Sequence, residues 1–136
     1  MATAGYSGTP LLKKLGIKDT MKVLLINAPG AYMEWLQTDI SGQLVTARQK
    51  TDMVHLFVTS ANEMVQQLVK LEPARKANPS IIIWVSWYKK SAGIATDVTE
   101  DVIRNYALQH SLVDIKVCAV SEQWSGLKLV VPVAKR

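Results

Sequence analysis

Two adjacent lysines, Lys89 and Lys90, are the residues of this sequence whose type and spacing best suit ligand chemistry. They lie in a loop with Ser91 and Gly93, between an apolar run and a pattern that starts a helix. Lysine ammonium groups beside the N–H groups of a helix N-terminus attract anions. The spacing predicts a site for a small anionic ligand, such as a phosphorylated compound or a nucleotide. The alternative is that both lysines are solvated and the loop is only flexible.

Further candidates lie where apolar, strand-like runs end, because ligands of open parallel sheets bind beyond the carboxyl ends of the strands. The residues predicted on this ground to bind a ligand are Asn27, Pro29, Thr59, Ser60, Ser86, Trp87, Lys89 and Lys90. Glu122 is an outlying candidate. If the protein is an enzyme, Ser86 or Glu122 would lie near the chemistry, with the lysines as anion clamps.

The histidines and the cysteine form no recognisable catalytic pattern. His55 lies within an apolar run, which favours a hydrogen-bonded core histidine over a general base. His110 lies near a helix C-terminus, where the helix dipole favours it. Neither histidine has a nucleophile or a second metal ligand at a known spacing. Cys118, the only cysteine, is predicted to be a buried thiol. We assign no catalytic residue, metal or cofactor.

Apolar runs predict the strands that must position these residues. The runs cover 23–26, 53–58, 81–85, 113–120 and 127–133, and the last two are joined by a loop that contains Glu122, Trp124 and Gly126. Trp84 and Trp87 would lie on opposite faces of the third strand, because side chains alternate along a strand.

Capping patterns predict the helices. Thr9 and Pro10 begin a short helix that ends at Gly16, and 31–36 can form a second. Ser60 with Glu63 opens a helix that Pro73 and the Asn78–Pro79 pair terminate. Asp97 with Glu100 forms another capping box, which opens a helix whose inward face carries Val102, Ile103 and Tyr106.

The alternation of strands and helices predicts an α/β fold in a single domain over 1–136. Right-handed βαβ crossovers give a mostly parallel sheet that is covered on both faces. The last connection is too short for a helix, so the final strand should run antiparallel. We expect a Rossmann-like three-layer α/β/α sandwich of about five strands with a C-terminal antiparallel hairpin strand.

Composition limits the function classes. Of the 136 residues, 49% are hydrophobic and 20% are charged, which is typical of a globular protein. No apolar run approaches the roughly 20 residues of a membrane span, and 1–6 lack the pattern of a leader, so we expect a cytoplasmic protein. The net charge of +5 comes from basic residues that are scattered along the chain as pairs or singles, without interleaved aromatics, which argues against nucleic-acid binding. The pairs are Lys13 and Lys14, Arg75 and Lys76, Lys89 and Lys90, and Lys135 and Arg136.

The order of elements resembles the S-adenosylmethionine-dependent methyltransferase fold. Residues 16–24 look like the approach to its first strand, 76–80 like the turn before its fifth, and 124–127 like the hairpin before its last. Nearly the whole chain also resembles a small family of uncharacterised bacterial proteins, through Tyr-Ser-Gly-Thr-Pro-Leu at 6–11 and Trp-Val-Ser-Trp-Tyr-Lys-Lys at 84–90. These resemblances imply a truncated, degenerate methyltransferase scaffold and very little about function.

The departures from the methyltransferase pattern concern its cofactor. An acidic residue at the end of the first strand and three following glycines are replaced by Leu25, Asn27, Pro29 and Ala31. Glycines let the backbone approach a ligand, whereas Pro29 has no N–H to donate. The interval 32–50 is also too short for the family's second and third strands, and Asp39 is no convincing ribose ligand. We therefore expect no cofactor bound in the family's manner.

Loss of those strands would leave the first strand at an edge of the sheet, where unpaired apolar strands promote association. Either residues 44–46 pair with it, or a second subunit covers it as a homodimer. Our first hypothesis is a non-catalytic binding or interaction module that uses the strand-end cleft or this edge. The alternative is an enzyme or binding protein for a small anionic ligand, and weak nucleic-acid association comes third.

Overall fold

The computed structural model describes residues 9–136, and within them it has one five-stranded sheet. The strands are β1 (Val23–Ile26), β2 (Met53–Phe57), β3 (Ile82–Tyr88), β4 (Val113–Ala119) and β5 (Trp124–Val130), in the order β1-β2-β3-β5-β4. β1, β2 and β3 are parallel, whereas β5 runs antiparallel to β3 and β4 on either side of it. This confirms the α/β fold and the antiparallel final strand. The motif at 6–8 lies outside the described residues.

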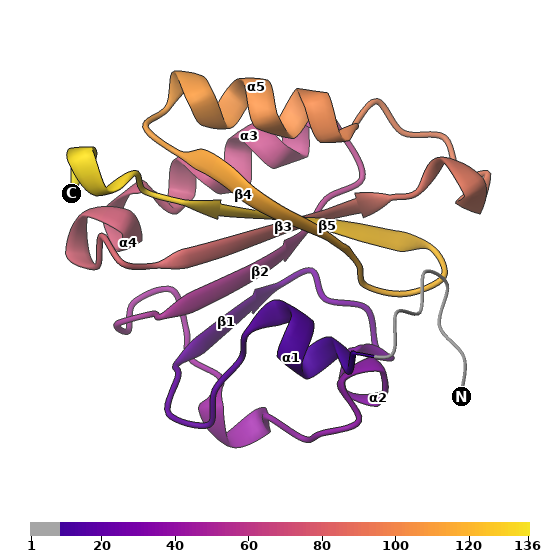
Figure 1. Ribbon diagram of the computed structural model, residues 1–136, viewed down its shortest axis with the longest axis horizontal. Helices are drawn as coiled ribbons and strands as arrows, with labels where there is room; N and C mark the ends of the chain where they lie inside the picture. Colours follow the sequence, from indigo (N-terminus) through magenta and orange to yellow (C-terminus); the bar gives the residue numbers. More distant parts are fainter. Residues whose placement is uncertain (1–8) are drawn as a thin grey trace.

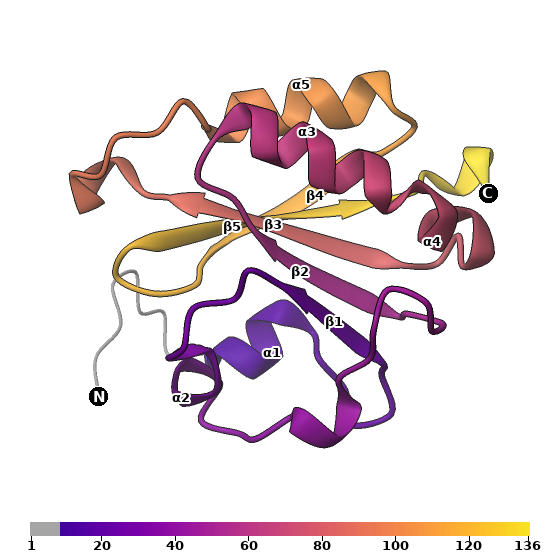
Figure 2. The same cartoon turned by 180° about the vertical axis from the view of Figure 1, so that it is seen from behind.

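Helices cover both faces of the sheet. The short helices α1 (Leu11–Leu15) and α2 (Tyr32–Leu36) lie on one face, and α3 (Ala61–Lys70) and α5 (Glu100–Gln109) lie on the other, as Figures 1 and 2 show from opposite sides. A further short helix, α4 (Glu72–Ala77), lies near the C-terminus at one end of the sheet. The three-layer architecture is thus confirmed.

The central strands β2 and β3 are continuous apolar runs because side chains on both faces of each strand are buried. Every residue of β2 is buried, and the middle of β3 is buried as well. Trp84 packs in the cluster under α1 and α2, where its Nε1 donates a hydrogen bond of 3.0 Å to the carbonyl of Leu15. Trp87 packs in the cluster under α3 and α5. The two tryptophans therefore lie on opposite faces, as the alternation predicts.

Three local predictions are wrong. Pro73 does not terminate α3 but lies in the first turn of α4, where its missing N–H has no helical partner to lose. The cap of α5 is Thr99, whose side chain accepts from Val102 N. The carboxylate of Asp97 accepts from Ala61 N at the start of α3 instead. Trp124 and Gly126 belong to β5 rather than to the preceding loop, and β5 ends at Val130 instead of at residue 133.

The exposed edge of β1 is partly covered by its own chain. Val45 N donates a hydrogen bond of 2.9 Å to Val23 O, and Val23 forms a parallel bridge with Leu44. This is the first of the two covers that the sequence predicts. The homodimer through this edge stays a prediction, because the structure describes one chain.

Candidate functional site

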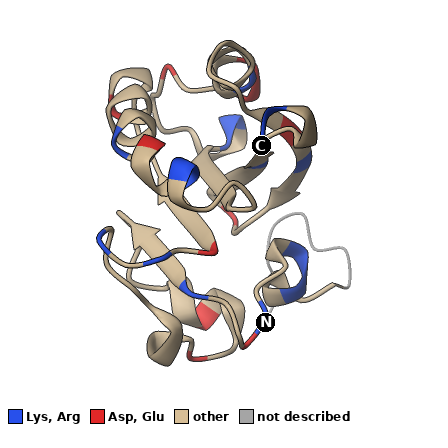
Figure 3. Ribbon diagram, turned by 90° about the vertical axis from the view of Figure 1, so that its left-hand side faces the viewer, with Lys and Arg blue, Asp and Glu red and all other residues tan. Residues whose placement is uncertain are grey.

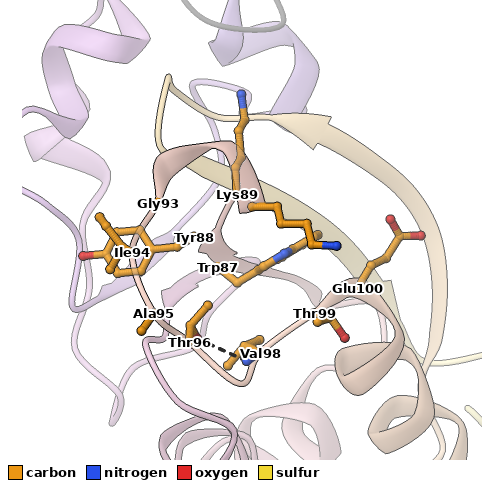
Figure 4. Close-up of a pocket in the computed structure, with 11 residues that line it drawn as sticks. Trp87, Tyr88, Lys89, Gly93, Ile94, Ala95, Thr96, Val98, Thr99 and Glu100 are labelled. Carbon is orange, nitrogen blue, oxygen red and sulfur yellow. Dashed lines mark hydrogen bonds between the residues drawn. The ribbon is translucent and has the colours of Figure 1, made fainter.

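A cavity of about 610 Å³ lies at the carboxyl end of β3. We call it the strand-end pocket. The end of β3 and the loop after it form one wall, and the start of α5 forms the opposite one (Figure 4). Its volume falls within the roughly 300–1,000 Å³ of small-molecule sites. The lining residues are Trp87, Tyr88, Lys89, Lys90, Gly93, Ile94, Ala95, Thr96, Val98, Thr99 and Glu100.

Hydrogen bonds hold the loop that closes this pocket against the neighbouring end of β2. Thr96 Oγ1 donates to Thr59 O at 2.8 Å and accepts from Val98 N at 3.1 Å. Asp97 Oδ1 accepts from Ala61 N at 2.8 Å. Gly93 has φ +69°, a left-handed conformation that favours glycine and lets the chain turn after Lys90. The end of the loop nearest α5 is therefore fixed by two hydrogen bonds to the junction of β2 and α3.

The lining of the pocket contains two lysines and one glutamate. Lys89 and Lys90 line it, and the pKa of Lys89 is lowered by partial burial and by nearby Lys14, against the opposing effect of Glu122. Glu100 is the acidic residue in the lining, and Arg104 binds it while also pairing with Asp101 and Asp114. Because the guanidinium compensates the Glu100 carboxylate, an anion in the pocket would meet less repulsion.

The structure brings together three of the predicted ligand residues and separates the others. Trp87, Lys89 and Lys90 share the pocket. Thr59 and Ser60 support it from outside its lining, because Thr59 O holds Thr96 and Ser60 Oγ caps α3 by accepting from Glu63 N. Glu63 Oε1 in turn accepts from Thr59 N.

Asn27 and Pro29 lie in the turn after β1. Asn27 is exposed and has φ +59°, a conformation that asparagine tolerates better than most residues. The turn leads into α2, and its Tyr32 side chain is buried in the core rather than pointing to solvent. Leu25 packs against the same apolar cluster. Leu25 therefore supplies apolar packing at the position where the methyltransferase pattern has an acidic residue.

Ser86 belongs to a buried polar network instead of the pocket. Its Oγ lies 2.6 Å from His55 Nε2, and Tyr32 Oη lies 2.7 Å from His55 Nδ1. All three side chains are buried, and burial lowers the pKa of His55 to about 3 and raises that of Tyr32. His55 stacks on Phe57 with ring centroids 4.4 Å apart. The geometry confirms the hydrogen-bonded core histidine.

The other residues with reactive side chains have structural surroundings. His110 caps α5, and its Nδ1 lies 2.7 Å from Tyr106 O, in agreement with the predicted helix-end role. Cys118 is only partly buried, because β4 is an edge strand; its pKa is raised by that burial. Glu122 is exposed in the β4–β5 turn. The described residues contain no cluster of three or more potential metal ligands.

Sequence reasoning missed most of the pocket's far wall. Ile94, Ala95 and Val98 lie in a segment with no strand or helix pattern, so the strand-end rule does not reach them. The sequence pattern of Asp97 with Glu100 pointed to Asp97 as the cap of α5, so Thr99 was not considered. Thr99 could have been found as a second candidate cap, because threonine is a good N-cap residue and precedes Val102 by three positions.

Comparison with solved structures shows the fold. A protein of the NADB-Rossmann superfamily from Streptococcus agalactiae matches with TM-score 0.56 and 6% identity, over 94% of this chain and 70% of its own. The chain has a Rossmann-like fold. An uncharacterized Listeria monocytogenes protein matches with TM-score 0.59 and 7% identity, over 92% and 68% of the two chains.

A third Rossmann-like neighbour is a Streptococcus pneumoniae protein provisionally assigned as a tRNA (m1A22) methyltransferase. It matches with TM-score 0.55 and 8% identity, over 90% of this chain and 70% of its own. The same protein has been solved with S-adenosyl-L-methionine. At these identities the likeness concerns the scaffold alone. No family model and no curated protein matches the sequence. No helix among residues 9–136 is long and apolar enough to cross a membrane.

Proposed function

We propose that the protein is a non-catalytic binding module on a methyltransferase-like scaffold, and that its strand-end pocket takes a small ligand with one anionic group and an apolar body. The observation that carries the proposal is the meeting of Lys89 and Lys90 with Trp87 and the start of α5 around one cavity of about 610 Å³. Residues from three successive segments of the chain thus face the same space.

The two parts of the ligand follow from the two kinds of lining. Lys89, Lys90 and the N-terminus of α5 favour negative charge. Ile94, Val98 and the aromatic side chains of Trp87 and Tyr88 offer an apolar surface. A ligand such as a nucleoside monophosphate or an aromatic phosphate has both features.

The residues of the β1 turn do not fit S-adenosylmethionine in the family's manner. Pro29 has no N–H, and Leu25 packs on apolar neighbours and has no group to bind a hydroxyl or an ammonium. A Cβ at Gly30 would meet no atom within 4 Å, so this glycine is not required for a close approach in the structure. We therefore route no step through that cofactor.

The buried network supports the non-catalytic part of the proposal. Ser86 and His55 have the residue types of a nucleophile and its base, but both side chains are 0% exposed. A nucleophile must reach the substrate, and Ser86 Oγ lies beside the Cβ position of Gly126 inside the sheet. The network is therefore assigned to the core.

A thermal-shift screen tests the proposal. Adenosine monophosphate, phenyl phosphate, S-adenosylmethionine and S-adenosylhomocysteine are each compared with buffer of equal ionic strength. A ligand at 100 times its Kd stabilises by about 2.7 kcal/mol. We expect stabilisation by a phosphate-bearing aromatic compound, and loss of it in a Lys89→Gln/Lys90→Gln double variant.

A matched variant separates the pocket from general charge. Arg48 and Lys50 are exposed in the connection between β1 and β2, so Arg48→Gln/Lys50→Gln removes the same charge elsewhere. The control should bind like the wild type. Stabilisation by S-adenosylmethionine alone would contradict the proposal and restore a methyltransferase interpretation. No stabilisation by any compound would favour a module that binds protein partners.

A further inference from the structure

Two of the dispersed basic pairs meet at the end of the molecule opposite the strand-end pocket. Arg75 and Lys76 lie in the last turn of α4, and Lys135 and Arg136 lie at the C-terminal end of the described chain. Together with Pro79, Ser111 and Val131 they line a cavity of about 270 Å³. We call these four residues and Ser111 the basic cleft.

The basic cleft is separate from the strand-end pocket. Pro79 lies just before β3, whereas the strand-end pocket begins where β3 ends at Tyr88. Figure 1 shows α4 and the C-terminus at one end of the sheet and the loop after β3 at the other. Figure 3 looks onto the α4 end, and basic positions are seen close to the C-terminus.

Arg75 is held in place by a hydrogen bond of its guanidinium. Its Nη2 donates a hydrogen bond of 2.9 Å to the carbonyl of His110, which fixes the guanidinium between α4 and the turn after α5. Its Nε is buried and has no hydrogen-bond partner among the described residues. A buried donor without an acceptor costs about 1–3 kcal/mol.

The positive charge of the cleft is not neutralised within the described part of the chain. The ion pairs formed between residues 9–136 all belong to Arg104, at a different place, and no acidic side chain lines the cleft. Glu72 lies at the start of α4, one turn before Arg75, and is not part of the lining. Four like charges around one small cavity repel one another, and an anion would relieve this repulsion.

We propose that the basic cleft binds the dianionic phosphate group of a small phosphomonoester. The planar guanidinium of Arg75 is suited to bidentate contact with phosphate oxygens. Lys76, Lys135 and Arg136 add charge, and Arg136 Nε is held by a hydrogen bond of 2.9 Å to Val131 O. The hydroxyl of Ser111 can donate to a third oxygen. The cavity is smaller than the roughly 300–1,000 Å³ of drug-sized sites, which favours a compact anion.

This site goes beyond the proposed function, because it uses none of the residues of the strand-end pocket. Its test is isothermal titration of the full chain with inorganic phosphate and with glycerol phosphate, at constant ionic strength. We expect binding by the wild type, and at least about a tenfold loss in Lys135→Gln/Arg136→Gln, since each lost charged hydrogen bond changes affinity by about this factor.

One variant controls for charge. Arg48→Gln/Lys50→Gln removes two positive charges elsewhere and should bind phosphate within about threefold of the wild type, because exposed charges contribute little at a distance. Arg75→Gln is a second test inside the cleft, and circular dichroism verifies that it folds.

The outcomes separate the alternatives. Equal loss of affinity in the cleft variant and in the Arg48→Gln/Lys50→Gln control would show nonspecific attraction to a basic protein and overturn the proposal. Binding of a single-stranded oligonucleotide through these residues, without binding of phosphate or glycerol phosphate, would overturn it in favour of a nucleic-acid surface. Loss of binding only in the cleft variants would support it.

Discussion

The hydroxyl of Ser86 on β3 lies 2.6 Å from Nε2 of His55 on β2, and neither side chain is exposed to solvent. The register of the parallel pair places His55 opposite Trp84 and Phe57 opposite Ser86, so the hydrogen bond joins neighbouring strands diagonally. Tyr32 completes the network from α2. The side chains that resemble a catalytic arrangement thus connect β2 to β3 and α2.

The buried histidine makes the fold sensitive to acid. Burial lowers the folded-state pKa of His55 to about 3 from 6.5. Between these values the unfolded chain binds a proton that the folded chain does not, so the free energy of unfolding should fall as pH decreases from 6.5 towards 3. The slope approaches about 1.4 kcal/mol per pH unit. Above pH 6.5 the contribution is constant.

Urea denaturation at several pH values between 7.5 and 4.5 measures this slope. His55→Gln should be less stable at neutral pH and should lose most of the slope over this range. His110→Gln removes the other histidine, outside the network, and should keep the wild-type slope. If His55→Gln and the wild type have the same slope, the acid sensitivity arises elsewhere.

A side chain at Gly126 should destabilise the fold. A Cβ at this position would lie 3.1 Å from Val120 Cγ2, 3.2 Å from Ser86 Oγ and 3.2 Å from Trp84 Cε3, all in buried side chains. We expect Gly126→Ala to lower the free energy of unfolding by about 1–3 kcal/mol, which is typical of overpacking. Thermal and urea denaturation measure the change.

Gly30→Ala is the matched control for that substitution. A Cβ at Gly30 would meet nothing within 4 Å, and Gly30 is not among the glycines with positive φ. Its effect should lie within about 0.5 kcal/mol of zero. If Gly126→Ala changes the free energy of unfolding as little as Gly30→Ala does, the close packing around Gly126 relaxes without cost.

The bridge at the edge of β1 should limit association of the chain with itself. Val45→Pro removes the N–H that donates to Val23 O, which leaves the edge of β1 less covered. We expect this variant to self-associate at lower concentrations than the wild type in sedimentation velocity. Val45→Ala keeps the N–H and should behave like the wild type.

The same measurement on the wild type tests the predicted homodimer. A wild-type chain that sediments as a monomer at micromolar concentration would reject self-association through the edge of β1. A wild-type dimer would support it if the dimer persists in Val45→Ala and if Val45→Pro forms a larger fraction of dimer at the same concentration.

Most of the fold could be predicted because its signals are local. Gly16 ends α1 in the left-handed conformation, and Ser60 caps α3, as their residue types indicate. Asp97 misled the prediction because aspartate caps helices as well as threonine does, and only the fold shows that its carboxylate serves α3 instead of α5.

The sites were less predictable, because they depend on segments that are far apart in the sequence. The strand-end rule found Trp87, Lys89 and Lys90 but not the loop that closes over them. The basic cleft joins the last turn of α4 to the end of the chain, and no spacing within either pair indicates the other. Ser86 lies near the carboxyl end of β3, as the strand-end rule requires, but its side chain is buried in the core and does not line the pocket.

The partial cover of β1 goes with an uneven distribution of burial across the sheet. β1 has two buried and two half-buried residues, whereas every residue of β2 is buried, so the centre of packing lies one strand further in. Beyond β1, residues 9–136 add one parallel bridge, between Val23 and Leu44, where the methyltransferase pattern has further strands. The stability of the sheet should therefore depend more on β2 and β3 than on the edge at β1.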